Sequence, residues 1–324
     1  MKTSSTKPDI GNTSVQSMFF WGSRRTFRLL PPVALALVAG GILSPRSLSP
    51  QQRQPSSEST LVITAQSKGG AAIELSAADL EIKGDGKQAT VLEVRRVSGA
   101  PLHYCIVFDS SGSARAAFEL QQKEATELLA RAIQAGRDRG WFVPFDSGVY
   151  PGPETDNPQV IAGAIVQERP RGVSALYDAM VSCAEQMSKS DPVPGQRTMF
   201  IFSDGQDNSS HSTRDATMLA LVQMRIRVYA VGQKGEPARK YRARGADILT
   251  HFAKSTGGRA YFPQNEKDVD ESVRNMADEF ASTFLVAYTS ADSKRDGRLH
   301  KLQVTCRRRD VSITAPDRYY APLQ

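Results

Sequence analysis

Five residues with oxygen-bearing side chains stand where the sequence predicts strand ends and the start of a helix. Three of them follow directly on the apolar run 102–108, one follows the apolar run 198–202, and one opens a predicted helix. They are Asp109, Ser111, Ser113, Ser174 and Asp204. Carboxylate and hydroxyl oxygens, with no histidine or cysteine among them, suit a hard cation: Mg²⁺ first, with Mn²⁺ or Ca²⁺ as alternatives. The set therefore predicts a divalent-metal site.

The predicted site carries little charge of its own. Ser111 and Ser113 are expected to coordinate the ion through their hydroxyls, and Asp109 and Asp204 to hold it directly or through water. With only two carboxylates around it, the ion stays electrophilic and attracts a further carboxylate from outside the chain. The alternative is that Asp109 and the serines cap the helix that follows them, because Asp and Ser favour that position.

Two further acids lie close to the candidates in the sequence. Asp207 is interpreted either as an acceptor behind the ligands or as a turn residue before Asn208. Asp178 is interpreted as a charge at the start of a helix, where acidic side chains are favoured. Neither is predicted to be a ligand.

A doubly wound α/β fold is predicted for the segment that carries the candidate residues, 99–283. Its apolar runs are short and nearly continuous, which indicates strands covered on both faces. They alternate with segments of helical periodicity, an order typical of a mostly parallel, Rossmann-like sheet with helices on both faces. Strands are predicted at 102–108, 140–145, 198–202, 227–231 and 258–262, and helices at 114–134, 160–166, 174–187, 213–224, 246–255 and 267–284. Such sheets bind ligands at the carboxyl ends of their strands, where the candidates lie.

The flanks of this domain have the pattern of strands. In the N-terminal segment, 60–98, apolar and polar residues alternate around a hairpin turn at Gly84–Lys87. In the C-terminal segment, 284–324, strands are predicted at 284–289, 299–306 and 311–314. Neither segment can bury an apolar face alone, so we expect the two to pair as one small β module.

The first 45 residues are predicted to be a signal peptide or an N-terminal anchor rather than part of the fold. The apolar stretch 29–43 has the length of a signal-peptide core, and Arg24, Arg25 and Arg28 precede it. The segment around the first two arginines also resembles a twin-arginine export signal. Residues 46–59 are rich in Pro, Ser and Gln and are predicted to be a linker. The protein is therefore expected to be exported to the periplasm, the cell envelope or the medium.

Composition excludes several classes of protein. The chain has 324 residues, 40% of them hydrophobic and 23% charged, which excludes wholesale disorder, and no apolar run is long enough for a polytopic membrane protein. Membrane contact is expected only through an uncleaved N-terminal segment. The net charge of +7 is a mild bias over this length and predicts no nucleic-acid partner. Among the three cysteines, Cys105 is interpreted as a buried small hydrophobe, and Cys183 with Cys306 as a pair that could form after export.

Three sequence segments resemble the motif loops of von Willebrand factor type A domains. They are FDSSGS at 108–113, GVSALYDA at 172–179 and FSDGQDN at 202–208. The family has a metal-ion-dependent adhesion site (MIDAS), and the resemblance places its ligands on the five candidate residues. Ser174 stands where the family usually has Thr, which keeps the oxygen but loses the methyl group that restricts the rotamer. The flanking segments resemble those of a secreted acidobacterial subgroup of the family.

Three functions follow as hypotheses. The first is an adhesion-type binding module whose metal captures an acidic side chain of a partner protein or peptide. The second is a structural module of the cell envelope with an idle metal site. The third is a phosphatase-like enzyme, which is not expected because Ser111 stands where such an enzyme needs a second carboxylate as general acid.

Overall fold

The computed structural model describes residues 58–68, 72–97, 99–189, 197–232, 240–289 and 294–323, with the backbone alone for 240–243. The predicted leader and nearly all of the predicted linker lie outside these residues. No helix in these ranges has the length and apolarity that a membrane crossing requires.

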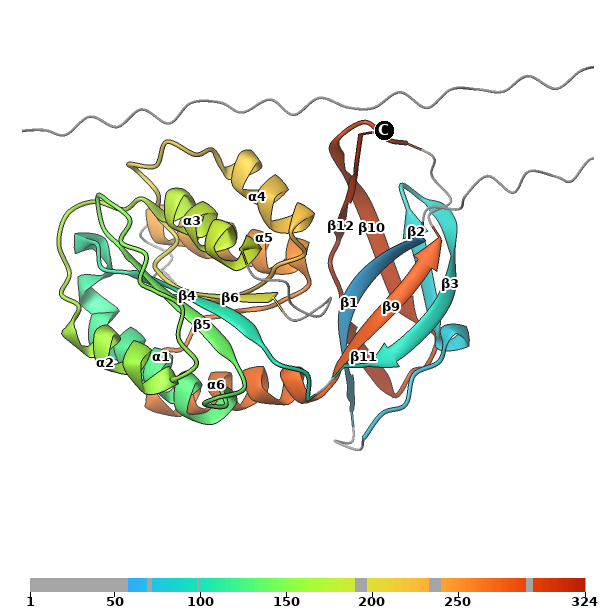
Figure 1. The fold of residues 1–324 in the computed structure, drawn as a ribbon, viewed down its shortest axis with the longest axis horizontal. Coiled ribbons are helices and arrows are strands. Elements are labelled where there is room, and N and C mark those ends of the chain that lie inside the picture. The colour runs from blue at the N-terminus through green and yellow to red at the C-terminus, as the bar shows by residue number, and fades with distance from the viewer. Residues whose placement is uncertain are drawn as a thin grey trace, which may run out of the picture. The chain divides into compact units, whose positions relative to one another are not determined.

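The metal-site candidates lie in a region built on a five-stranded parallel sheet (Figure 1). Its strand order is β5-β4-β6-β7-β8, and every neighbouring pair is parallel. The strands are β4 (His103–Asp109), β5 (Arg139–Phe145), β6 (Arg197–Phe202), β7 (Arg227–Val231) and β8 (Ala260–Tyr261). The predicted mixed α/β class with a parallel sheet is therefore confirmed.

Helices pack on both faces of this sheet. Their ranges are α1 (Phe118–Ala132), α2 (Pro158–Gln167), α3 (Leu176–Ser188), α4 (Arg214–Gln223), α5 (Lys240–Thr256) and α6 (Glu266–Ala281). Ile106 of β4 shares one apolar core with residues of α1, α2 and α6, whereas Val107 shares the other with residues of α3, α4 and α5. Because alternate side chains enter two buried layers, the strands are apolar at nearly every position.

Helix starts account for most differences from the predicted boundaries. After β4 the chain first forms a 3-10 turn, Gly112–Ala117, so the first α-helix begins at Phe118 rather than near Ser113. Helix α5 begins at Lys240, six residues before the predicted start at Ala246. Thr213 caps α4 by accepting a hydrogen bond from the backbone N–H of Ala216.

A second, seven-stranded antiparallel sheet combines the N-terminal and C-terminal strands, in the order β11-β1-β9-β3-β2-β10-β12 (Figure 1). The strands are β1 (Glu58–Ser67), β2 (Leu80–Gly84), β3 (Lys87–Arg96), β9 (Thr283–Thr289), β10 (Arg298–Cys306), β11 (Val311–Thr314) and β12 (Arg318–Ala321); a short 3-10 turn (Ala77–Asp79) precedes β2. Strand β1 starts inside the predicted linker, and β12 was not predicted. Asp85 and Gly86, both with positive φ, make the two-residue turn between β2 and β3.

Cys183 does not pair with Cys306, the pairing that the sequence left open. Cys183 of α3 forms a disulfide with Cys105 of β4, with their Cα atoms 6.2 Å apart, and Cys306 of β10 is a free thiol. Cys105 and Cys183 meet because α3 packs directly on the sheet, where both side chains are fully buried. Cys306 lies in the other sheet and has no access to this layer.

Loss of the disulfide should cost stability. It closes a loop of 78 residues, for which chain entropy gives a stabilisation of about 4 kcal/mol. We expect Cys105→Ala to lower the free energy of unfolding in urea by several kcal/mol. Cys306→Ala serves as the matched control and should change it by less than about 1 kcal/mol. Equal stability of Cys105→Ala and the oxidised wild type would contradict the assignment.

Helix α1 buries a carboxylate that no hydrogen bond compensates. Glu124 is 1% exposed, and both of its oxygens lack a partner in the part of the chain that the structure describes. Burial raises the pKa of Glu124 to about 8, and the charge of Glu127 acts in the same direction. The folded state therefore keeps a proton that the unfolded chain releases near its ordinary pKa of 4.5.

Stability should consequently fall as the pH rises from about 4.5 to 8. Glu124→Gln lacks this titrating group. The free energy of unfolding of Glu124→Gln minus that of the wild type should therefore be about 3 kcal/mol larger at pH 7 than at pH 4. Urea unfolding at the two pH values measures the change. Glu119→Gln, at an exposed position of the same helix, should show no such trend. An identical stability difference at both pH values would refute the buried, protonated state of Glu124.

Candidate functional site

Three loops at the carboxyl ends of the parallel strands contain all five candidate ligands. The first loop, Asp109–Ser113, leaves β4, and the third loop, Ser203–Asn208, leaves the adjacent strand β6 at the centre of the sheet. The second loop, Arg171–Ser174, leads into α3. Parallel strands end at the same edge, which explains why residues about a hundred positions apart come together.

Asp109 is the most enclosed of the candidates. Its side chain is 0% exposed; Oδ1 accepts a hydrogen bond from the Ser111 N–H at 2.9 Å, and Oδ2 accepts one from the Ser203 hydroxyl at 2.6 Å. Burial raises the pKa of Asp109 to about 6, although the hydrogen bonds from Ser111 and Ser203 oppose the rise. The negative charge of Asp204 contributes to it, which places the two carboxylates in electrostatic reach of each other.

The two hydroxyls of the first loop converge. Ser111 Oγ and Ser113 Oγ are 3.0 Å apart, with Ser111 buried and Ser113 exposed. Neither hydroxyl caps a helix. The side chain of Ser111 makes no capping hydrogen bond to the 3-10 turn that follows it, and the residue at the N-cap of α1 is Ala117. The hydroxyls are thus not used up as helix caps.

Ser174 is tied to the third loop and not to the first. Its hydroxyl donates to the Gln206 carbonyl at 2.7 Å, and its N–H donates to Asn208 Oδ1 at 2.9 Å. Both oxygens of Asp204 accept from Gln206, one from the backbone N–H and one from the side-chain amide. The structure therefore links Asp109, Ser111 and Ser113 through one chain of hydrogen bonds, while Ser174 and Asp204 share contacts with Gln206.

Three positioning residues were not predicted. Ser203 joins the first and third loops through Asp109, and Asn208 joins the third loop to Ser174. Asp146, at the end of β5, accepts from Arg171 Nε at 2.6 Å and holds the second loop. Ser203 could have been predicted, because it stands next to Asp204 in the sequence. Asn208 and Asp146 could not, because their roles depend on contacts that sequence spacing does not reveal.

The acids beside the candidates connect the third loop to α3. Asp207 accepts hydrogen bonds from the Tyr177 N–H and the Ser210 hydroxyl. Asp178 lies in the first turn of α3, as predicted, and accepts from the backbone N–H groups of His211 and Ser212. Neither carboxylate contacts the five candidates, so both act as supports.

The donor set fits a small hard cation. Among the described residues neither Asp109 nor Asp204 pairs with a Lys, Arg or His, so two neighbouring carboxylates lack a compensating positive charge. Nor do these residues hold any cluster of three or more His, Cys, Asp and Glu side chains suited to a metal. A cation at this edge would therefore depend on the serine hydroxyls as well as on the carboxylates.

Two glycines let α5 approach the third loop closely. A Cβ on Gly245 would lie 2.0 Å from the Asp204 carbonyl oxygen, and one on Gly205 would lie 2.3 Å from the Gly245 carbonyl oxygen. Gly205 also has a φ of 77°, which other residues adopt at a cost. The backbone that carries Asp204 is thus held against α5 with no room for a side chain.

Filling this contact should displace the third loop. We expect Gly245→Ala to lower the free energy of unfolding by about 2 kcal/mol through overpacking at Asp204. Thermal unfolding measures the loss. Gly163→Ala is the control, because its Cβ would meet nothing within 4 Å and alanine favours the helix. If Gly245→Ala were as stable as wild type, the close packing of α5 on this loop would be wrong.

Comparisons with known proteins found matches among solved structures. No protein-family model matches the chain, and no curated protein matches it. Similar solved structures include a von Willebrand factor type A protein from Catenulispora acidiphila, at 11% identity over 83% of this chain and 75% of that one (TM-score 0.45). BatB from Bacteroides thetaiotaomicron matches at 13% identity over 55% and 99% (TM-score 0.42), and an aerotolerance-related membrane protein from Bacteroides fragilis at 15% over 55% and 98% (TM-score 0.43).

Solved structures that resemble this chain thus include a von Willebrand factor type A domain, as the three motif loops predict. With identities below 25% and TM-scores below 0.5, these likenesses carry no argument about this chain. Function has to be inferred from the arrangement of the residues.

Proposed function

We propose that this protein is an exported, divalent-metal-dependent binding module that captures an acidic side chain of a partner protein or peptide. The observation that carries the proposal is the pair of carboxylates, Asp109 and Asp204, without a basic partner among the described residues, next to the converging hydroxyls of Ser111 and Ser113. Export rests on the apolar stretch 29–43 and the arginines before it.

The residues that would hold the ion are Asp109, Ser111, Ser113, Ser174 and Asp204. Bound there, Mg²⁺ (or Mn²⁺ or Ca²⁺) would supply a positive charge with a coordination position for a foreign carboxylate. Ser174 acts as a hydrogen-bond donor to Gln206, so its oxygen lone pairs remain available to a cation. Ser203 donates to Asp109 Oδ2 and favours the ionised form that a metal requires.

Metal binding gives the first test. A cation that binds only the native state stabilises it by about 2.7 kcal/mol at a hundred times its dissociation constant. We expect Mg²⁺ or Mn²⁺ to raise the melting temperature of the wild type and EDTA to reverse the shift. Asp109→Ala should abolish the metal-dependent shift, whereas Asp215→Ala, at an exposed position of α4, should keep it. A metal shift that persists in Asp109→Ala would place the ion elsewhere.

Acid capture needs a second measurement. Immobilised acidic peptides, each paired with its Asn or Gln counterpart, should retain the protein in Mg²⁺ and release it in EDTA, and the amide counterparts should not bind. Retention unaffected by chelation or by the amide substitution would count against the proposed function.

One observation favours the second candidate, a structural envelope module with an idle site. Ser174 and both oxygens of Asp204 already have partners inside the third loop or next to it. In that case the wild type would show no metal-dependent shift at millimolar Mg²⁺ or Mn²⁺. That the protein is not an enzyme stays a prediction from the sequence.

A further inference from the structure

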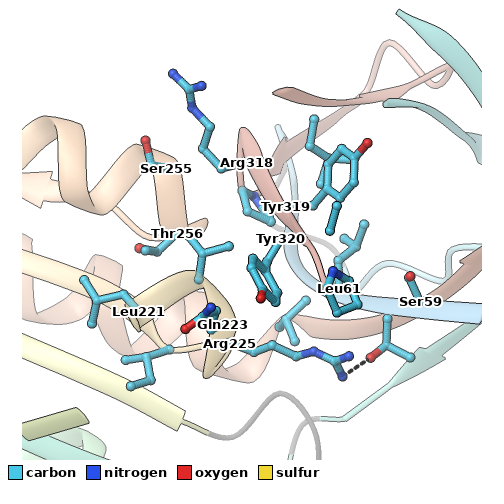
Figure 2. A pocket seen from close by; sticks show the side chains of 18 of the residues that line it. Ser59, Leu61, Leu221, Gln223, Arg225, Ser255, Thr256, Arg318, Tyr319 and Tyr320 are labelled. Atoms are coloured by element: carbon cyan, nitrogen blue, oxygen red, sulfur yellow. Dashed lines mark hydrogen bonds between the residues drawn. The ribbon is translucent and has the colours of Figure 1, made fainter. Parts of the chain in front are cut away.

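A cavity of about 420 Å³ lies away from the candidate metal site, between the antiparallel sheet and the ends of α4 and α5. Strands β1 and β9 and the segment around β12 form one side, and the turn from α4 to β7 forms the other. Figure 2 shows Tyr320 pointing into this space, toward Gln223 and Arg225. Its size is within the range of small-molecule sites.

The lining combines apolar walls with positive charge. Leu61, Leu221, Ile226 and Leu302 are each less than 10% exposed and form part of the walls. Among the described lining residues Glu58 has the single carboxylate. Five lining residues are cationic: Arg225, Arg227, Lys294, Arg295 and Arg318. Two of these charges are already paired, Lys294 with Asp85 at 2.9 Å and Arg318 with Asp317 at 3.5 Å. Such a lining suits an apolar body that carries one negative group.

Arg225 is held in a conformation that arginine does not favour. It follows α4 directly with a φ of 54°, at the helix end where glycine or asparagine is usual because an L side chain is strained there. Its guanidinium donates to the Thr60 hydroxyl at 2.5 Å and has no carboxylate partner among the described residues. Figure 2 shows Arg318, by contrast, with its guanidinium pointing away from Tyr320. The backbone bonds from the Arg225 N–H to the Val222 carbonyl and from the Ile226 N–H to the Leu221 carbonyl account for this helix end, and Arg225 lies there on the wall of the cavity.

We propose that this cavity is a second binding site, for a small amphiphile with an apolar chain and one anionic headgroup, and that Arg225 recognises the headgroup. The walls of Leu61, Leu221, Ile226 and Leu302 take up the chain. The guanidinium of Arg225 is exposed and makes no ion pair with any carboxylate of the described residues, so it pairs with the anion by charge-assisted hydrogen bonds. The site shares no residue with the proposed metal site, so either can exist without the other.

Isothermal titration calorimetry with three eight-carbon probes tests the site: octanoate, 1-octanol and octylammonium. We expect octanoate to bind the wild type with a stoichiometry of one and at least tenfold more tightly than 1-octanol, and octylammonium not to bind. EDTA should leave octanoate binding unchanged. Absence of saturable octanoate binding at millimolar concentration, or equal affinity for octanoate and octanol, would overturn the proposal.

The variants separate recognition from a structural role of Arg225. Arg225→Gly should weaken octanoate binding at least tenfold without lowering the melting temperature, since glycine favours this backbone conformation. Arg225→Gln should weaken it similarly, and Arg95→Gln, which removes an exposed charge on β3, should not. Leu285→Trp, which reduces the cavity, should weaken octanoate and octanol alike. If Arg225→Gly instead lowered the melting temperature and left the octanoate affinity unchanged, Arg225 would have a structural role through its bond to Thr60. That result would contradict the proposed recognition of the headgroup by Arg225.

Discussion

The candidate site depends on one buried, uncompensated carboxylate. An isolated charge inside a protein is costly. Hydrogen bonds from Ser111 and from the Ser203 hydroxyl stabilise the charge of Asp109, while Asp204 adds a second negative charge nearby. Each neighbouring loop is fixed with respect to this group: the third through Ser203, and the second through the bond from the Gly112 N–H to the Gly172 carbonyl. A divalent cation would neutralise the charge of these two carboxylates without a basic side chain.

The two sheets have different relations to this centre. Strand β4 runs between β5 and β6 with both faces covered, so its carboxyl end is rigid, and the Cys105–Cys183 disulfide ties it to α3, the helix that follows Ser174. The antiparallel sheet joins distant parts of the chain, β1 with β9 and β2 with β10. It contributes no ligand, but its contact with α4 and α5 encloses the cavity beside Arg225.

Sequence reasoning succeeded where burial leaves a pattern. Strands covered on both faces are apolar at nearly every position, so β4, β5, β6 and β7 were predicted to within one residue. Strand β12 (RYYA) and the start of α5 (KYRARG) lack such a pattern, since their apolar residues are few or irregular. The partner of Cys183 and the role of Asn208 depend on which elements pack together, and spacing alone does not contain that information. Five oxygen donors could be named from the sequence, but not that Ser174 bonds to Gln206 rather than to the first loop.

The central claim is that these oxygens enclose a cation. Anomalous diffraction from crystals grown with Mn²⁺ tests it most directly, because the signal locates the ion independently of the protein atoms. We expect one strong peak bounded by Asp109, Ser111, Ser113, Ser174 and Asp204, with directly coordinating oxygens at about 2 Å. Crystals with abundant Mn²⁺ that show no peak there, and with Asp109 still bonded only to Ser111 and Ser203, would contradict it.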